Sequence, residues 1–410
     1  MIIYRAYRTE LDPNNVQRTA FLQHAGAARW AYNFGLRRKI ESYRETGKSP
    51  SAIDLHRELN VLKRKSQEDG GVPWMYEVSK SAPQEALRDL DKAFQHFFRR
   101  CKEGKGRKGF PKFKSRKRGI GGFRLTGAIH AGARTIRLPR IGEIRLKEAG
   151  YLAIKDAKIL SVSVTEQAGR WFVSLTVKEE RPDPAQPTGP VLGVDVGIVH
   201  LAALSDGTVF ENPRALKAAE ARLRRLQKSV SRKVKGSNNR RKAKVRLARR
   251  HYRVACIRKD AIQKATTAAI AKQPTAIGIE TLNVCGMLQN HHLARSLSDA
   301  SMSEVLRCLE YKAKRAGIRV VKADRWFPSS KMCSRCGAVR STLALADRTF
   351  RCLSCGFVLD RDLNAAINLK NFAASSAVTA CGAGSAGFGC KTGTKLPAAK
   401  QEPNTVEACP

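Results

Sequence analysis

The segment Val191–Gly197 places one carboxylate inside an apolar run, and this restricts the possible folds more than any other feature of the chain. Its sequence, Val-Leu-Gly-Val-Asp-Val-Gly, is typical of a buried β-strand. An ionised carboxylate in such a strand costs several kcal/mol unless a partner compensates it, and a metal ion is an effective partner. Alternatively, Asp195 only caps the turn that leads to Gly197 and the apolar run at His200–Ala202. The presence of other carboxylates that could join Asp195 in a metal site distinguishes the two interpretations.

The charge balance indicates a nucleic-acid partner. Of 410 residues, 77 are Lys or Arg and 35 are Asp or Glu, so the formal net charge is +42 and the pI is near 10.4. A surplus of this size attracts polyanions, of which nucleic acid is the commonest. The sequence shows neither a signal peptide nor an apolar run as long as a membrane span. We therefore expect no membrane partner, and a cytoplasmic, nucleoid-associated protein of a prokaryotic type of cell.

The first half of the chain is predicted to combine a helical domain with a small β-module. Helical periodicity predicts a helical domain at residues 16–101, with Asn14 or Asn15 as a cap of its first helix. From Phe123 to Lys178 the period changes to two, which predicts strands, including a hairpin across Gln167–Gly169. We expect residues 1–15 and 102–185 to form an open barrel or a sandwich. A proline-rich linker follows before Val191.

A glycine-rich basic segment, Gly104–Arg118, interrupts this pattern. Many charge runs are solvated loops, but Phe110 and Phe113 interleave this one, and aromatic rings next to basic side chains favour contact with a nucleic acid. The candidate contact residues in this segment are Arg107, Lys108, Lys112 and Lys114.

A second basic segment, Arg214–Lys259, contains 19 Lys or Arg residues and one acid, Glu220. Its apolar residues keep helical spacing, and Gly236–Asn239 divides it into two helices. A solvated helical pair would mix charges of both signs to stabilise itself, so the near absence of acids favours contact with phosphates. The candidate residues here are Arg240, Arg241 and Lys242.

Two further acidic positions complement Asp195. Glu280 ends a second short apolar strand, Ala276–Glu280, and Asp362 lies at the start of a short amphipathic helix. A solvent-facing Glu280 and an N-cap role for Asp360 or Asp362 are the simpler alternatives. If the three carboxylates meet, their oxygens suit Mg²⁺ or Mn²⁺, which leave coordination positions open for substrate phosphates. Two such ions can activate water and stabilise the leaving oxygen at a scissile phosphate.

Four of the eleven cysteines form two C-x-x-C pairs separated by 15 residues. Each pair is followed by a glycine, as a tight turn requires. Two such turns supply the four soft ligands of a tetrahedral Zn²⁺ site, and a closed site of four cysteines is structural. The ligands are Cys333, Cys336, Cys352 and Cys355.

The order of these features resembles the TnpB family of transposon-encoded RNA-guided nucleases, which is related to the effectors of type V CRISPR systems. The most specific part of the resemblance is the block from the first cysteine to Asn368, which includes the run Asp360-Arg-Asp-Leu-Asn-Ala-Ala366. Leu90–Phe94, Gly109–Lys114 and Phe327–Lys331 also look like segments of the family. The resemblance covers nearly the whole chain.

The resemblance implies a multidomain α+β protein: a helical recognition domain and a β-barrel wedge module, then an RNase H-like (RuvC) α/β nuclease domain at 191–372 with a zinc ribbon inserted at 328–358. It implies that Asp195, Glu280 and Asp362 are the catalytic acids, with Asp360 as the alternative to Asp362. The partners would be a guide RNA and double-stranded target DNA, with one protein molecule per RNA. A transposase acting on the ends of its own element and a cleavage-silent RNA-guided repressor are the competing functions.

The composition of the C-terminal end, at 373–410, is rich in Ala, Gly, Ser and Lys. Such a composition buries too little apolar surface to order a chain, so we expect this tail to be disordered.

Overall fold

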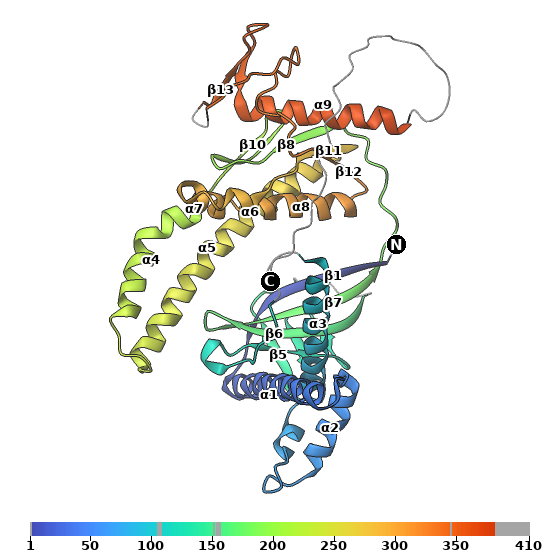
Figure 1. Cartoon of the computed structure of the whole chain (residues 1–410), viewed down its shortest axis with the longest axis vertical. Coiled ribbons are helices and arrows are strands. Elements are labelled where there is room, and N and C mark those ends of the chain that lie inside the picture. Colours follow the sequence, from blue (N-terminus) through green and yellow to red (C-terminus); the bar gives the residue numbers. More distant parts are fainter. Residues whose placement is uncertain (1, 105–108, 151, 153–156, 345–346, 382–410) are drawn as a thin grey trace, which may run out of the picture.

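The protein is described from a computed structural model. It covers the chain apart from residues 1, 105–108, 151, 153–156, 345–346 and 382–410. Figure 1 shows two halves, each built around a β-sheet, and an extended segment after β7 (Arg170–Glu180) joins them. No helix in the described part of the chain is both long enough and apolar enough to cross a membrane.

The first half contains a seven-stranded antiparallel sheet in the order β2-β6-β7-β1-β5-β4-β3. The N-terminal strand, β1, lies in the middle of this sheet, because it pairs with β7 along its length and with β5 at its end. The predicted hairpin is confirmed, and Ala168 and Gly169 both have positive φ angles in its two-residue turn. The other strands are β1 (Ile2–Asp12), β2 (Gly122–Leu125), β3 (His130–Ala131), β4 (Thr135–Leu138), β5 (Gly142–Leu146) and β6 (Lys158–Gln167).

The open barrel or sandwich expected for this module stays a prediction. In the described residues its seven strands form one sheet, with β2 and β3 at the two edges.

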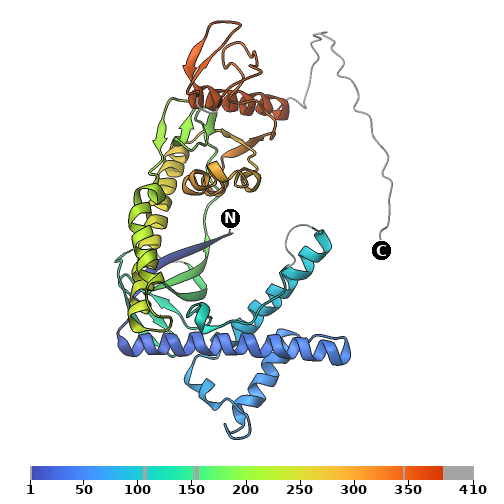
Figure 2. The same ribbon diagram turned by 60° about the vertical axis from the view of Figure 1, so that its left-hand side comes forward.

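Helices cover one side of this sheet (Figure 2). Asn14 caps the first of them, since its side chain accepts from the Gln17 backbone while the Gln17 side chain accepts from the Asn14 backbone. Phe21 on this helix packs against Trp171 of the sheet with 4.9 Å between ring centroids, so the helices and the sheet share one core. The helical elements are α1 (Asn15–Thr46), α2 (Ala52–Arg64), η1 (Pro73–Glu77), α3 (Ser81–Glu103) and η2 (Arg116–Arg118).

The second half is built on a five-stranded sheet in the order β10-β9-β8-β11-β12. The three strands β8, β11 and β12 are parallel, and β9 and β10 continue the sheet in antiparallel fashion. Helices α5 and α8 lie on one face of the sheet and α9 lies on the other (Figure 1). The strands are β8 (Leu192–Asp195), β9 (His200–Leu204), β10 (Val209–Glu211), β11 (Ala276–Glu280) and β12 (Arg319–Ala323).

The predicted helical pair of the basic segment is present, and it projects from the second half toward the first half (Figures 1 and 2). Ser237 caps its second helix, which runs twelve residues beyond the end of the basic segment, to Ala271. The remaining elements are α4 (Ala215–Ser231), α5 (Asn238–Ala271), α6 (Val284–Met287), α7 (His291–Ala300), α8 (Met302–Arg315), β13 (Thr349–Arg351), β14 (Val358–Asp360) and α9 (Arg361–Cys381).

The predicted start of the disordered tail, at residue 373, is wrong, because residues 373–381 continue helix α9. Ala373 is fully buried, and its methyl group would lie 3.1 Å from a Cβ placed on Gly278. The small side chains that make this segment resemble a disordered tail therefore allow close packing of a helix on the sheet. Residues 382–410 lie outside the described part of the chain.

Candidate functional site

Two of the three predicted acids stand side by side at the end of the parallel strands. Strand β8 pairs with β11 in a register that sets Gly193 beside Gly278 and Val194 beside Ile279. Asp195 and Glu280 are the next residues of the two strands. Neighbouring strands lie about 4.8 Å apart, so these two carboxylates share one edge of the sheet.

Two glycines allow α9 to bring the third acid to the same edge. A Cβ on Gly193 would lie 1.8 Å from the carbonyl oxygen of Ala366, and a Cβ on Gly278 would lie 2.2 Å from that of Leu369. Only glycine permits this close approach of the helix backbone to both strands. Each glycine precedes an acid by two residues, and the helix that it admits carries Asp362 in its first turn.

The electrostatics of the site indicate that the three acids interact. Burial raises the pKa of Asp195 well above its ordinary value, and the negative charges of Glu280 and Asp362 raise it further. Burial also raises the pKa of Glu280, while a hydrogen bond from Ser329 and the positive charge of Arg361 act in the opposite direction. Clustered carboxylates with this cost of ionisation suit a divalent cation, which offsets their charge.

The oxygen atoms of the three acids lie farther apart than the ligand atoms of one small metal ion do. In the described part of the chain, only the four cysteines bring their ligand atoms within 4.8 Å of one another. Two ions about 3.5–4 Å apart need a wider set of carboxylates, and the donor chemistry of the three acids fits Mg²⁺ or Mn²⁺.

The structure separates the roles of Asp360 and Asp362. The Oδ1 atom of Asp360 accepts hydrogen bonds of 3.0 Å from the backbone amides of Asp362 and Leu363, so Asp360 caps α9. Asp360 is exposed, whereas Asp362 is half-buried, and both negative charges raise the pKa of Asp195, that of Asp362 more than that of Asp360. This geometry favours Asp362 as the third acid.

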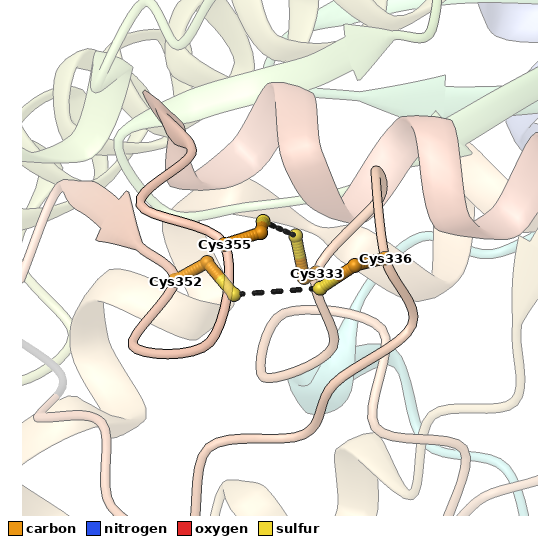
Figure 3. Close-up of side chains that lie close together, drawn as sticks. All are labelled: Cys333, Cys336, Cys352 and Cys355. Atoms are coloured by element: carbon orange, nitrogen blue, oxygen red, sulfur yellow. Dashed lines mark hydrogen bonds between the residues drawn. The ribbon is translucent and has the colours of Figure 1, made fainter.

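The four cysteines of the predicted zinc site come together (Figure 3). The Sγ atoms of Cys333 and Cys355 are 3.8 Å apart, and those of Cys336 and Cys352 are 3.6 Å apart. Gly337 and Gly356 follow the two pairs with φ angles of 77° and 70°, as the predicted tight turns require. Two turns with four converging thiols fit a tetrahedral Zn²⁺ site.

Proton sharing among the thiols also fits a metal site. Backbone amides of Cys355 and Ser354 donate to Cys352 and lower its pKa to about 6. The Ala338 backbone lowers the pKa of Cys336, but hydrogen bonds with the neighbouring thiols outweigh that effect and raise it to about 12. A metal ion that binds such a cluster releases the shared protons.

Two buried asparagines of α9 tie the zinc turn to the acidic site, and sequence reasoning missed them. The side-chain amide of Asn364 donates to the Met332 carbonyl at 2.8 Å, and its Oδ1 atom accepts from the Ser334 amide at 3.0 Å. The Asn368 amide donates to the carbonyls of Ser329 and Met332, both at 2.7 Å. The sequence did offer a signal for these two asparagines: they are spaced four residues apart on one helix, directly after the last predicted acid, and so share one face of it.

Ser329 completes this connection, because its hydroxyl donates a hydrogen bond to Glu280 Oε1. Ser329 is buried, with 4% of its surface exposed, and its backbone carbonyl is held by Asn368. The zinc turn, helix α9 and the carboxylate of β11 therefore form one continuous hydrogen-bonded arrangement.

The predicted nucleic-acid contacts differ in how free their side chains are. Arg107 and Lys108 lie outside the described residues, and Lys112 is exposed. Lys114 is also exposed as a residue, but its ammonium group lies 3.8 Å from the centre of the Tyr32 ring, and desolvation there lowers the pKa of Lys114. These contacts already engage the Lys114 side chain within the protein.

The candidate contact residues of the second basic segment also differ in whether their side chains are free. Arg240 donates from Nη1 to the Lys233 carbonyl at 2.6 Å and so closes the turn between α4 and α5. Arg241 and Lys242 are exposed on α5, where their charges face solvent.

Comparison with known proteins assigns the chain to a family. A protein of Streptomyces pristinaespiralis named "Putative RNA-guided DNA endonuclease" is 35% identical over 99% of this chain and 98% of its own length. A protein of Escherichia coli K12, "Putative RNA-guided DNA endonuclease InsQ", is 31% identical over 92% of this chain and 94% of its own length. The chain belongs to the TnpB family. The resemblance noted in the sequence is thereby confirmed.

Family models match three segments of this TnpB-family chain. They are described as "Probable transposase" at residues 174–291, "Cas12f1-like, TNB domain" at 303–369 and "Helix-turn-helix domain" at 1–48. Residues 1–48 of this chain contain a strand and a single long helix, β1 and α1, so the last description does not match the fold seen here.

A solved structure supports the overall architecture. The structure of a Cas12f1–sgRNA–target DNA complex aligns with a TM-score of 0.55 and 14% identity over 90% of this chain and 99% of that chain. This similarity shows a shared multidomain α/β fold. The internal boundaries of the TnpB-family domains stay predictions.

Proposed function

We propose that the protein is an RNA-guided DNA endonuclease encoded by a transposable element, and that it hydrolyses phosphodiesters at Asp195, Glu280 and Asp362. The observation that carries this proposal is the meeting of these three acids: parallel register aligns two of them, and the field of Asp362 acts on Asp195. The names of its full-length relatives support the same reaction.

The three acids would hold Mg²⁺ or Mn²⁺ at the edge of an RNase H-like (RuvC) domain formed by residues 191–372. When bound, these ions supply activation of water and stabilisation of the leaving oxygen. Ser329 keeps one Glu280 oxygen in place, and the positive charge of Arg361 limits the repulsion among the acids. The four cysteines would hold a structural Zn²⁺, which fixes the turn that carries Ser329.

Target choice would come from base pairing between a guide RNA and one DNA strand, with the protein reading backbone shape and a short adjacent motif. The net charge of +42 supports binding of both nucleic acids, and one protein molecule per RNA is our expectation. The helices of 16–101 and the sheet of the first half would hold the guide and the heteroduplex.

The proposal is tested by purifying the protein from cells that carry its native flanking DNA and sequencing the RNA that copurifies. We expect a discrete RNA that runs from the 3′ end of the gene into the flanking DNA. With that RNA and Mg²⁺, the protein should cut a matched target, and Asp195→Ala should abolish cutting while RNA binding is retained. Absence of a discrete RNA, or cutting only at the ends of the element, would favour a transposase instead.

A further inference from the structure

A tryptophan with a largely exposed side chain lies next to the acidic site. Trp326 has 79% of its surface exposed, more than any other Phe, Tyr or Trp residue in the described part of the chain. The other three tryptophans, Trp30, Trp74 and Trp171, are partly or fully buried. A single exposed apolar side chain is common on protein surfaces. The position of Trp326 and the support of its backbone distinguish it from that case.

The loop that carries Trp326 begins at the edge of the sheet where the acids meet. Strand β12 pairs with β11 in parallel, with Ala323 beside Glu280, and the loop starts at the next residue, Asp324. The loop returns to the acids at Ser329, whose hydroxyl donates to Glu280 Oε1. Three residues of chain join Trp326 to Ser329, so their Cα atoms are at most about 11 Å apart. Trp326 therefore lies beyond the carboxyl ends of the parallel strands, where sheets of this kind bind their ligands.

Contacts on both sides of Trp326 hold its backbone in place. The Trp326 amide donates to Asp324 Oδ1 at 2.9 Å, and the Ser329 amide donates to the Phe327 carbonyl at 2.9 Å. The ring of Phe327 packs on Phe372 of α9 with 5.0 Å between ring centroids. The loop thus packs one aromatic ring against α9 and leaves the neighbouring indole exposed. Because the backbone is already fixed, a partner that meets the indole has to order only one side chain.

The charge next to the indole suits a nucleic acid. The Arg325 guanidinium lies 4.9 Å from the centre of the Trp326 ring, and Arg325 forms no ion pair among the residues that the structure describes. An aromatic face stacks on a base, and a neighbouring cation binds the phosphate backbone. The two parts of a binding site for single-stranded nucleic acid therefore lie side by side at the edge of the acidic site.

We propose that Trp326 stacks on an unpaired base of the DNA strand that is cut, within about three nucleotides of the scissile phosphate. This inference rests on the proposed function. The limit follows from the reach of about 11 Å and the spacing of about 3.4 Å between nucleotides of one stacked strand. The stacked base fixes the strand beside the acids, and Arg325 binds an adjoining phosphate. The phosphodiester is thereby held in position for hydrolysis.

The contact selects unpaired DNA and leaves the choice of target to the guide. Bases in a duplex are covered by their neighbours, so a single indole reaches the face of a base only where the strand is unpaired. Every base has such a face, and stacking is therefore tolerant of sequence. Base pairing with a guide RNA remains the step that reads the target.

Three variants separate stacking from other roles of the side chain. Trp326→Leu removes the aromatic face and retains an apolar side chain, whereas Trp326→Phe retains a smaller aromatic face. Leu353→Ala is the control, because it truncates an apolar side chain with 81% of its surface exposed in the second cysteine turn. Stacking of one base on one ring corresponds to about fivefold to 150-fold in an equilibrium constant. Trp326→Leu should slow single-turnover cleavage of a matched target by that factor, Trp326→Phe by about threefold at most, and Leu353→Ala not at all.

Abasic DNA identifies the base and excludes a purely structural effect of the substitution. In the strand that is cut, the nucleotides on either side of the cut are replaced one at a time by an abasic residue. At one position within about three nucleotides of the cut, this loss should slow the unaltered protein by about fivefold to 150-fold and should not slow Trp326→Leu, because the base and the ring act only together.

Two results of these assays would overturn the assignment. The first is an equal effect of every abasic position on the unaltered protein and on Trp326→Leu. The second is cleavage by Trp326→Leu at the unaltered rate, and a simultaneous loss of self-association in gel filtration would then make the ring a contact between copies of the chain.

Fluorescence tests the stacking separately from the proposed function, which fails if the unaltered protein with its copurified RNA cuts no matched DNA. In that case, single-stranded oligothymidylate is added to the unaltered protein and to Trp326→Phe, with Ca²⁺ in place of Mg²⁺. The difference between the two emission spectra isolates the signal of Trp326. We expect the oligonucleotide to quench this difference signal, and an unchanged signal would refute the stacking role of Trp326 whatever the enzyme cuts.

Discussion

Replacing Ser329 by alanine tests whether the zinc turn positions the acidic site. The change removes one hydroxyl, the donor to Glu280 Oε1, and leaves the backbone carbonyl that Asn368 holds. A hydrogen bond to a charged group contributes about 1.5–3 kcal/mol, which corresponds to about tenfold to a hundredfold in an equilibrium constant. Loss of partners that orient metal ligands has effects of the same size, about 10–100-fold.

The pH dependence follows from the same bond. The Ser329 hydroxyl lowers the pKa of Glu280, so its removal raises that pKa further. Because the ionised carboxylate is the form that binds a cation, Ser329→Ala should need more Mg²⁺ and a higher pH for half-maximal cleavage. The single-turnover rate at limiting Mg²⁺ should fall about tenfold to a hundredfold, and excess Mg²⁺ at higher pH should restore part of it.

The assay is cleavage of a matched target by the protein–RNA complex across Mg²⁺ concentration and pH. Ser330→Ala is the control, since it removes the same atom one residue away, where the described structure gives the hydroxyl no hydrogen bond. Zinc content and melting temperature are measured for both variants. The reasoning is refuted if the two variants cleave alike, or if Ser329→Ala loses zinc and stability along with activity.

Three further changes examine the acids and the cysteines separately. Asp195→Asn should abolish cleavage. Without added Mg²⁺ or Mn²⁺ and above about pH 4, it should also raise the melting temperature by roughly 2–4 °C per kcal/mol gained, because burial and neighbouring charges destabilise the ionised carboxylate in the folded protein only. Calorimetry showing a lower melting temperature would contradict this. Asp360→Ala should lower the free energy of unfolding by about 1 kcal/mol, because a helix cap is lost, and should retain cleavage. Asp362→Ala should lose cleavage while its stability is nearly unchanged. Urea unfolding measures the stability of both variants, and cleavage rates measure their activity. Cys352→Ser should lose the single bound Zn²⁺ that elemental analysis measures, and a full zinc content in this variant would rule out the site. In the unaltered protein, acidification should release the zinc, because the thiolates take up protons.

Local patterns predicted much of the structure. The apolar strand around Asp195, the Asn14 cap, the hairpin turn and the two cysteine turns each depend on a few neighbouring residues, and each was correct. The choice between Asp360 and Asp362 remained open in the sequence, because either residue can cap a helix. The hydrogen bonds at the start of α9 support Asp362, and its assignment as the third acid stays a prediction.

The features that the sequence did not reveal depend on contacts between distant segments. Gly193 and Gly278 look like ordinary strand glycines until α9 is packed against both of them. Ser329 lies 49 residues from Glu280, and no periodicity links them. The Ala-rich residues after 372 resemble a disordered tail, because their packing surface is supplied by the sheet.

The central claim, that a guide RNA directs cutting by the three acids, is tested most directly by reprogramming. The copurified RNA is synthesised with its guide segment exchanged for a new sequence, and the protein is assayed with Mg²⁺ on two DNAs, one matched to each guide. We predict that cutting moves to the newly matched DNA and that Asp195→Ala abolishes it on both. Cutting that stays at the original site whatever the guide, or that persists in Asp195→Ala, would contradict the account.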